Sequence, residues 1–166
     1  MFNAIVNFDN LLQAAERARK GKRYRRASLE FFDNLEENLI QLQNELMHDQ
    51  FEPGHYREFY VFEPKKRLIS APCFRDRVVH HAIHGVIEPI IDKRFIFDSY
   101  ACRHGKGTHR GADRAQRFIR IVKRNHGRVY ALKADISRYF QSIDHNVLKR
   151  IVFRHLDCER TRRLLF

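Results

Sequence analysis

Residues 133–145 read Lys133-Ala134-Asp135-Ile136-Ser137-Arg138-Tyr139-Phe140-Gln141-Ser142-Ile143-Asp144-His145, and this stretch decides the fold that the sequence predicts. The segment 129–136 is almost continuously apolar, as in a strand that is buried on both faces. Asp135 would therefore emerge at the rim of a sheet. A charge there is costly unless something binds it, so the pattern predicts a carboxylate that holds a divalent cation. The alternative is that Asp135 caps the following helical turn.

Two other residues of this stretch allow two interpretations each. Asp144 precedes a helical pattern, so we expect it to cap that helix. Phe140 lies five residues after Asp135 and could face a bound sugar, where a 2′-hydroxyl would collide with it. An aromatic residue near an apolar strand is more often part of the core. The offset from Asp135 favours the sugar-facing role.

The charge of the chain indicates a partner rich in phosphate. Lysine and arginine number 32 against 20 acidic residues, which gives a net charge of +12 and a pI near 10.1. Basic and aromatic residues alternate in residues 22–26 and 56–67, a mixture suited to phosphate contacts and base stacking. A basic but merely solvated surface is the alternative. With 43% hydrophobic residues, the chain can also bury a core.

The cysteines and the hydropathy pattern restrict the location of the protein. Three cysteines without a Cys-x-x-Cys pair, and no N-terminal leader pattern, predict a reduced, cytoplasmic protein. No segment approaches the roughly 20 apolar residues that a membrane span needs. Cys102, His104 and His109 lack the spacing of a structural zinc site, and the pair His80 and His84 lacks the glutamate of a zinc-protease helix.

Periodicity predicts several helices and one hairpin. We expect helices over 8–20, capped by Asn7 or Asp9, over 28–46, capped by Ser28, over 78–91, over 112–122 and over 147–156. The leucine stripe of the second helix fits packing on its own domain or a short coiled-coil seam. Pro89 should end or kink the third helix near Glu88. Residues 56–63 and 67–70 form the predicted hairpin, with Pro64-Lys65-Lys66 at a basic tip.

Three motifs in order resemble those of bacterial reverse transcriptases. They are Arg67-Leu68-Ile69-Ser70-Ala71-Pro72 with Asp76-Arg77-Val78-Val79, then Ser99-Tyr100-Ala101-Cys102-Arg103 with Gly105-Lys106-Gly107-Thr108-His109, and finally the Asp135 stretch. Within that superfamily the second motif, together with Tyr56-Arg57-Glu58-Phe59 before Glu63-Pro64-Lys65, is most similar to the enzymes of diversity-generating retroelements.

The resemblance implies an activity and a set of partners. It implies an RNA template copied into DNA with Mg²⁺ as the metal, deoxynucleotide triphosphates as substrates, and cDNA or primer as a further partner. For the subfamily it also implies error-prone copying aided by a basic accessory oligomer.

The same resemblance assigns roles to six residues. Asp135 and the backbone of Ile136 match metal ligands, Asp135 being the catalytic carboxylate, and Phe140 matches the aromatic residue that faces the sugar. Lys65 and Arg67 match positions that touch the incoming triphosphate, and Arg77 matches the arginine of the fingers motif. Taken singly, each of these cations could instead be solvated, and Arg77 could pair with Asp76 or with a helix end.

The fold class that follows is α+β, an incomplete right-hand polymerase fold. We expect an N-terminal helical region over 1–55, β-hairpin fingers over 56–127, and the first strand and helix of a palm over 128–166. The Tyr-x-Asp-Asp turn of the family is absent, and no residue that stops helices follows Thr161, so we expect the fold to continue beyond Phe166. By itself the chain is predicted not to polymerise.

Other functions stay open at this point. A non-catalytic RNA-binding module with a fingers-like fold would use the same basic face. A group II intron, retron or defence-associated reverse transcriptase would share the same motifs. Sequence-specific DNA binding is disfavoured, because no helix-turn-helix or zinc-finger pattern is present.

Overall fold

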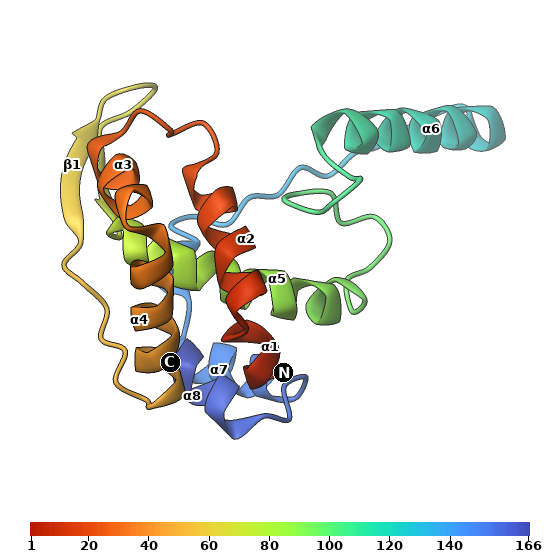
Figure 1. The fold of residues 1–166 in the computed structure, drawn as a ribbon. Helices are drawn as coiled ribbons and strands as arrows, with labels where there is room; N and C mark the ends of the chain where they lie inside the picture. Colours follow the sequence, from red (N-terminus) through yellow and green to blue (C-terminus); the bar gives the residue numbers. More distant parts are fainter. The chain divides into compact units, whose positions relative to one another are not determined.

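A computed structural model describes residues 1–166 (Figure 1), which form two compact units. Unit 1 comprises Met1–Pro89 together with Cys158–Phe166, and unit 2 comprises Ile90–Asp157. The chain is mostly helical with one two-stranded hairpin, which confirms the predicted α+β class. None of its helices combines the length and the apolar character that crossing a bilayer requires. The predicted domain boundaries at 55/56 and 127/128 stay a prediction.

Unit 1 begins with two helices, α1 (Phe2–Ile5) and α2 (Phe8–Arg19). The side chain of Asn7 caps α2 by accepting hydrogen bonds from the backbone N–H groups of Asp9 and Asn10, at 2.9 and 3.3 Å. These groups have no partner inside the helix, so the cap stabilises the first turn. The predicted helix and its Asn7 cap are confirmed.

The predicted helix over 28–46 is two helices, α3 (Arg26–Asp33) and α4 (Leu35–Met47). Asn34 separates them because its backbone, at φ −122° and ψ 53°, leaves the helical region. The side chain of Asn38 donates to the carbonyl of Phe31 at 3.0 Å and so satisfies an acceptor at the end of α3. Ser28 is buried inside α3, so its predicted capping role is wrong.

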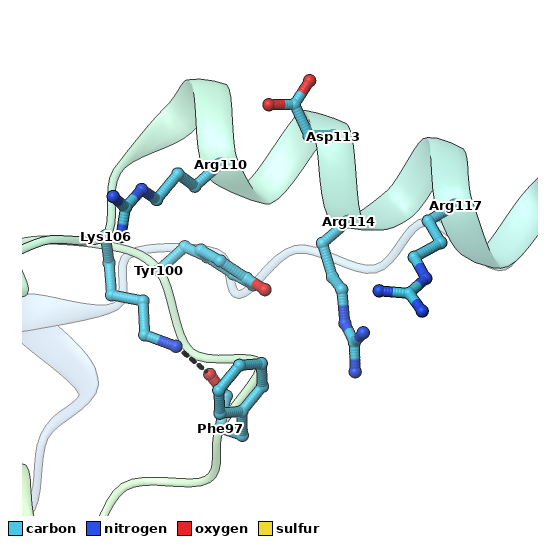
Figure 2. A pocket seen from close by; sticks show the side chains of 7 residues that line it. All are labelled: Phe97, Tyr100, Lys106, Arg110, Asp113, Arg114 and Arg117. Atoms are coloured by element: carbon cyan, nitrogen blue, oxygen red, sulfur yellow. Dashed lines mark hydrogen bonds between the residues drawn. The ribbon is translucent and has the colours of Figure 1, made fainter.

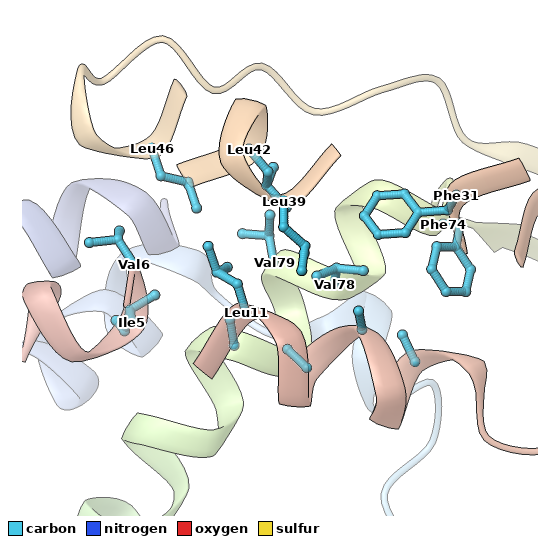
Figure 3. Close-up of a cluster of buried hydrophobic side chains, with 14 of the residues drawn as sticks. Ile5, Val6, Leu11, Phe31, Leu39, Leu42, Leu46, Phe74, Val78 and Val79 are labelled. Atoms are coloured by element: carbon cyan, nitrogen blue, oxygen red, sulfur yellow. The ribbon is translucent and has the colours of Figure 1, made fainter. Parts of the chain in front are cut away.

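The core of unit 1 lies between α2, α4 and α5 (Phe74–Asp92), and Figure 3 shows their side chains meeting. Leu39, Leu42 and Leu46 of α4 are almost completely buried there. The leucine stripe therefore packs on its own domain. Aromatic rings close one side of the core, where the centroids of Phe31 and Phe74 lie 5.1 Å apart. The last helix, α8 (Glu159–Leu165), adds Leu164 at the margin.

The third predicted helix is longer than its periodicity indicated. Helix α5 begins at Phe74 and continues through Pro89 to Asp92, so Pro89 does not end it at Glu88. Proline removes one N–H group, whose acceptor would be the carbonyl of Gly85 four residues earlier. Gly85 is exposed, so water can bond that carbonyl instead. The missing hydrogen bond also lies in the last turns of α5, where its absence costs the helix little stability.

The predicted hairpin is present in unit 1. Strand β1 (Arg57–Val61) pairs antiparallel with β2 (Arg67–Ala71), and the register places Phe59 opposite Ile69 and Val61 opposite Arg67. The side chains of β1 are exposed, so the hairpin presents its aromatic residues to solvent.

Unit 2 contains α6 (Thr108–His126), a short 3₁₀ helix η1 (Phe140–Ser142) and α7 (His145–Phe153). The predicted strand over 129–136 is absent, which is a correction to the sequence analysis. A strand needs a partner to bond its backbone, and no other segment of unit 2 is a strand. Tyr130 and Leu132 are consequently 86% and 96% exposed.

Candidate nucleic-acid interface

The tip of the hairpin carries two of the predicted site residues. Lys65 lies in the turn and Arg67 begins β2, and both side chains are exposed and make no ion pair. The neighbouring Lys66 places its Nζ atom 4.5 Å from the ring centroid of Tyr60 and 5.9 Å from that of Phe62. Such cation–aromatic pairs match the mixed chemistry of phosphate and base contacts. The tip is therefore open to a polyanion.

Arg77 lies in the first turns of α5, half-buried, with its guanidinium carbon 5.0 Å from the ring centroid of Phe74. It does not pair with Asp76. That carboxylate is almost fully buried and accepts a hydrogen bond at 2.9 Å from the backbone N–H of Gly54. Asp76 therefore fixes the segment before the hairpin, and the positive charge of Arg77 is left without a carboxylate.

Asp135 lies in an exposed segment of unit 2. Its Oδ1 atom accepts a hydrogen bond at 3.0 Å from the backbone N–H of Ile136, and a turn at 137–139 follows before η1. This is not the geometry of a helix cap. Asp144, in contrast, accepts from the N–H groups of Asn146 and Val147 at the start of α7, which confirms its predicted capping role.

Phe140 opens η1 and is 79% exposed. Its ring meets that of Tyr139 edge-on, with centroids 5.2 Å apart. The structure therefore does not place Phe140 in a core, which leaves its flat face accessible to a ligand.

The six predicted residues divide by unit. Lys65, Arg67 and Arg77 belong to unit 1, whereas Asp135, Ile136 and Phe140 belong to unit 2. The structure brings the last three together along one short segment. A common cleft for both groups stays a prediction.

The oxygen atoms near Asp135 fit part of a magnesium site. Its carboxylate and the carbonyl of Ile136 are oxygen donors, the kind that Mg²⁺ prefers. No group of three His, Cys, Asp or Glu side chains gathers anywhere in the chain to hold a metal. Mg²⁺ in phosphoryl-transfer sites is commonly bound through one or two carboxylates, with water and substrate phosphates as the other ligands. Asp135 and Ile136 would thus supply a fraction of the ligands.

A cluster that the sequence analysis missed surrounds a cavity of about 330 Å³ in unit 2 (Figure 2). Its lining residues are Phe97, Tyr100, Lys106, Arg110, Asp113, Arg114 and Arg117. The Nζ atom of Lys106 donates to the carbonyl of Phe97 at 2.6 Å and lies 3.8 Å from the ring centroid of the same residue. A cation is thereby fixed near two aromatic rings, since the ring centroid of Tyr100 lies 5.0 Å from the same Nζ atom.

One face of α6 completes this cavity. Arg110, Arg114 and Arg117 are spaced by four and three residues, which places them in one row along the helix. Figure 2 shows Asp113 pointing away from this row. Arg114 pairs with Asp98 at 2.9 Å, and this hydrogen bond lowers the pKa of that carboxyl group. Arg117 makes no ion pair, so the row keeps net positive charge.

The loop before α6 is held by the arginine of the Tyr-Ala-Cys-Arg motif. Arg103 bonds Asp92 at 2.6 Å and donates to the carbonyls of Ile96 and Ser99. Gly111 allows Tyr100 to approach α6, because a Cβ atom there would lie 3.3 Å from the tyrosine ring. The spacing of the three arginines was visible in the sequence. Its connection to Phe97 and Tyr100 was not, because it depends on the path of the loop.

Comparisons with known proteins place the chain beside intron maturases. It is 30% identical over 118 residues to the mitochondrial nuclear intron maturase 2 of Arabidopsis thaliana, covering 61% of this chain and 15% of that protein. It is 28% identical over 127 residues to the protein YkfC of Escherichia coli, covering 75% and 33% respectively. Mitochondrial nuclear intron maturase 1 of Arabidopsis thaliana is 30% identical over 86 residues, covering 50% and 11%. No protein-family model matches the chain.

These similarities support a reverse transcriptase-like family, in agreement with the resemblance of the sequence motifs. They do not distinguish the branch of diversity-generating retroelements from other branches. The chain spans between 11% and 33% of the length of these three relatives.

Proposed function

We propose that the chain is part of an RNA-directed DNA polymerase, a nucleotidyltransferase that copies RNA into cDNA. The observation that carries the proposal is the cation–aromatic cavity of unit 2, which precedes the Asp135 motif in the chain. Its arginine row suits phosphate groups, and its rings suit bases. The similarity to intron maturases supports the same conclusion.

The predicted residues have distinct roles in this proposal. Asp135 and the Ile136 carbonyl would hold Mg²⁺, which stabilises charge on the transferring phosphoryl group when it is bound. Phe140 would lie against the sugar of the incoming nucleotide, an orientation that its exposure permits. The remaining three residues, Lys65, Arg67 and Arg77, would contact the triphosphate.

The finer assignment concerns partners. We propose template RNA, cDNA or primer, and deoxynucleotide triphosphates as ligands of the whole enzyme, in the cytoplasm. Membership of a diversity-generating retroelement would add a basic accessory oligomer. This assignment rests on the Tyr-Ala-Cys-Arg and Gly-Lys-Gly-Thr-His motifs. Group II intron, retron and defence-associated enzymes are the alternatives.

A second candidate is a non-catalytic RNA-binding module. It is favoured by the lack of a multi-ligand metal cluster, since no group of three His, Cys, Asp or Glu side chains gathers in this chain to hold a metal. The two candidates share the cation–aromatic cavity of unit 2, and they differ in whether a catalytic metal is used.

RNA binding is tested by fluorescence anisotropy on single-stranded RNA over a range of salt concentrations. The double variant Arg110→Gln/Arg117→Gln should weaken binding and reduce the slope of log affinity against log salt by about 0.7 for each lost contact. The control is Arg94→Gln/Arg154→Gln, which removes the same charge at exposed positions outside the cavity. Equal effects of both double variants would contradict the assignment of the cavity.

Polymerase activity is tested by primer extension on an RNA template. The chain alone should extend no primer, whereas the chain joined to the remaining polymerase segments should extend it with Mg²⁺. RNA binding without extension by the joined protein would favour the non-catalytic module.

A further inference from the structure

A second cationic cavity lies in unit 1, on the exposed side of α5. It has a volume of about 270 Å³ and is lined by Arg77, His80, His81 and His84. These four residues follow the spacing i, i+3, i+4 and i+7, so they share one face of the helix. No carboxylate lines this cavity, which we name the histidine cavity.

The arginine of the histidine cavity carries an uncompensated charge. Arg77 makes no ion pair, and its Nε atom is buried without a hydrogen-bond partner. Its neighbour Arg75, in contrast, pairs with Glu45. A half-buried guanidinium without a counter-ion is costly, and a bound anion would remove that cost.

Charges on the adjoining elements add to the positive potential. From α2, Arg17 donates to the carbonyl of His81 at 3.4 Å, and Lys22 follows the end of that helix. Burial lowers the pKa of His81. Positive charges on four neighbours lower it further, namely Arg17, His84, Arg77 and Lys22. An acidic neighbour is Glu88, whose carboxylate lies 3.5 Å from Nδ1 of His84. His81 therefore resists protonation until an anion enters the cavity.

We propose that the histidine cavity binds a phosphate group and that binding strengthens as the pH falls. The ligand class is a phosphate ester, supplied either by an RNA backbone or by a free nucleotide. A protonated histidine donates from both ring nitrogens and attracts the anion, whereas the neutral ring offers one donor and no charge. Binding and protonation are linked, so a phosphate that binds the protonated histidines more tightly also raises their pKa values. The two effects correspond to the same coupling free energy.

This inference does not rest on the proposed polymerase function. Arg77 is shared with that proposal, in which it contacts the triphosphate, but the similarity to reverse transcriptases assigns none of the three histidines, and all four residues lie in unit 1. A protein that fails to extend a primer would leave the histidine cavity unaffected.

The test is an NMR titration of the histidine ring C–H signals in the complete chain. The probes are the ribotetranucleotide UUUU, whose diester charges do not change between pH 5.5 and 7.5, and UMP. We expect UUUU to move the signals of His80, His81 and His84, and to bind about tenfold tighter at pH 5.5, since one unit of pKa shift corresponds to tenfold in affinity. Tighter binding of UUUU would identify the RNA backbone as the source, and tighter binding of UMP a nucleotide.

Three variants complete the test. Arg77→Gln should abolish the shifts. Since Arg77 stacks on the buried Phe74, the exposed double variant His80→Gln/His84→Gln provides a check that does not depend on the core, and it should weaken the pH dependence. His48→Gln, on the exposed end of α4, is the matched control and should bind like the wild type. Affinity that is independent of pH, or shifts equally large at His48, would overturn the proposal.

Discussion

The two units use the same helical pattern with opposite results. In unit 1 the apolar stripe of α4 is buried, with Leu39 and Leu42 fully enclosed (Figure 3). In unit 2 the apolar stripe of α6 is open, with Phe118 and Ile119 exposed by 44% and 47%. Leu156 is the one fully buried residue between 90 and 157. Periodicity therefore predicts that a helix forms, but it does not predict what covers the helix.

This difference separates stability from binding. Unit 1 contains a continuous core, which stabilises it by removing apolar surface from water. Unit 2 displays arginines, aromatic rings and apolar side chains to solvent, as a binding surface does. We expect the free energy of unfolding to come mainly from unit 1 and nucleic-acid contacts to involve both units.

The largest expected difference is between two matched truncations. Leu42→Ala should lower the free energy of unfolding by about 2–5 kcal/mol, because it leaves a cavity in the core. Ile121→Ala should change it by less than about 0.5 kcal/mol, because Ile121 is 46% exposed on α6 and alanine favours the helix.

Urea denaturation followed by circular dichroism measures both variants. Amide hydrogen exchange provides a second reading, since α4 should be protected near the global level and α6 far less. Similar losses for Leu42→Ala and Ile121→Ala would show that α6 is packed as tightly as α4, and the contrast between the units would fail.

A smaller difference is expected between the two helix caps. Asn7→Ala removes the cap of α2, which packs against α4, and should lower the free energy of unfolding by about 1 kcal/mol. Asp144→Ala removes the same kind of cap from α7, a helix with no buried residue. Its effect should appear mainly as faster amide exchange in α7, with less than about 0.5 kcal/mol in global stability. Equal global losses would contradict this distinction.

The smallest effects concern the thiols. The neighbouring Thr161, and after it the backbone of Phe2, lower the pKa of Cys158 to about 7. Burial raises the pKa of Cys73. Alkylation of Cys158 by iodoacetamide should therefore reach half its maximal rate near pH 7, whereas Cys73 should need a more alkaline pH, because the thiolate is the reactive form.

Mass spectrometry of pH-dependent labelling distinguishes the three cysteines. Cys102 of unit 2 is exposed and serves as the accessible reference. Thr161→Val should move the midpoint of Cys158 upward, and an unchanged midpoint would show that Thr161 does not lower the pKa.

Local signals in the sequence predicted much of the fold. The Asn7 cap, the hairpin across Lys65, and the Asp144 cap depend on a few neighbouring residues, and all three are confirmed. The strand over 129–136 depends on partner strands that this chain does not provide, so an apolar run was not sufficient. The break at Asn34 was not predicted either, and Phe31 before it and Leu39 after it both lie in the core.

The candidate site was predictable in chemistry more than in geometry. The motifs predicted site roles for Asp135 and Phe140, which stay predictions, and the structure exposes both residues in one short segment of unit 2. The cation–aromatic cavity of unit 2 is lined by Phe97 and Tyr100, which lie in a loop held by Arg103, and by three arginines of α6. That loop path depends on tertiary contacts, so residue spacing alone did not reveal it.

The most direct test of the polymerase proposal compares two aspartates in primer extension on an RNA template with Mg²⁺. The protein is the chain joined to the remaining polymerase segments, and the variants are Asp135→Asn and Asp144→Asn. Asparagine caps a helix as well as aspartate does, so Asp144→Asn should keep its activity. Asp135→Asn should lose at least about 100-fold, because a metal ligand contributes more than the outer residues that orient it. Full activity of Asp135→Asn, or equal losses in both variants, would contradict the proposal.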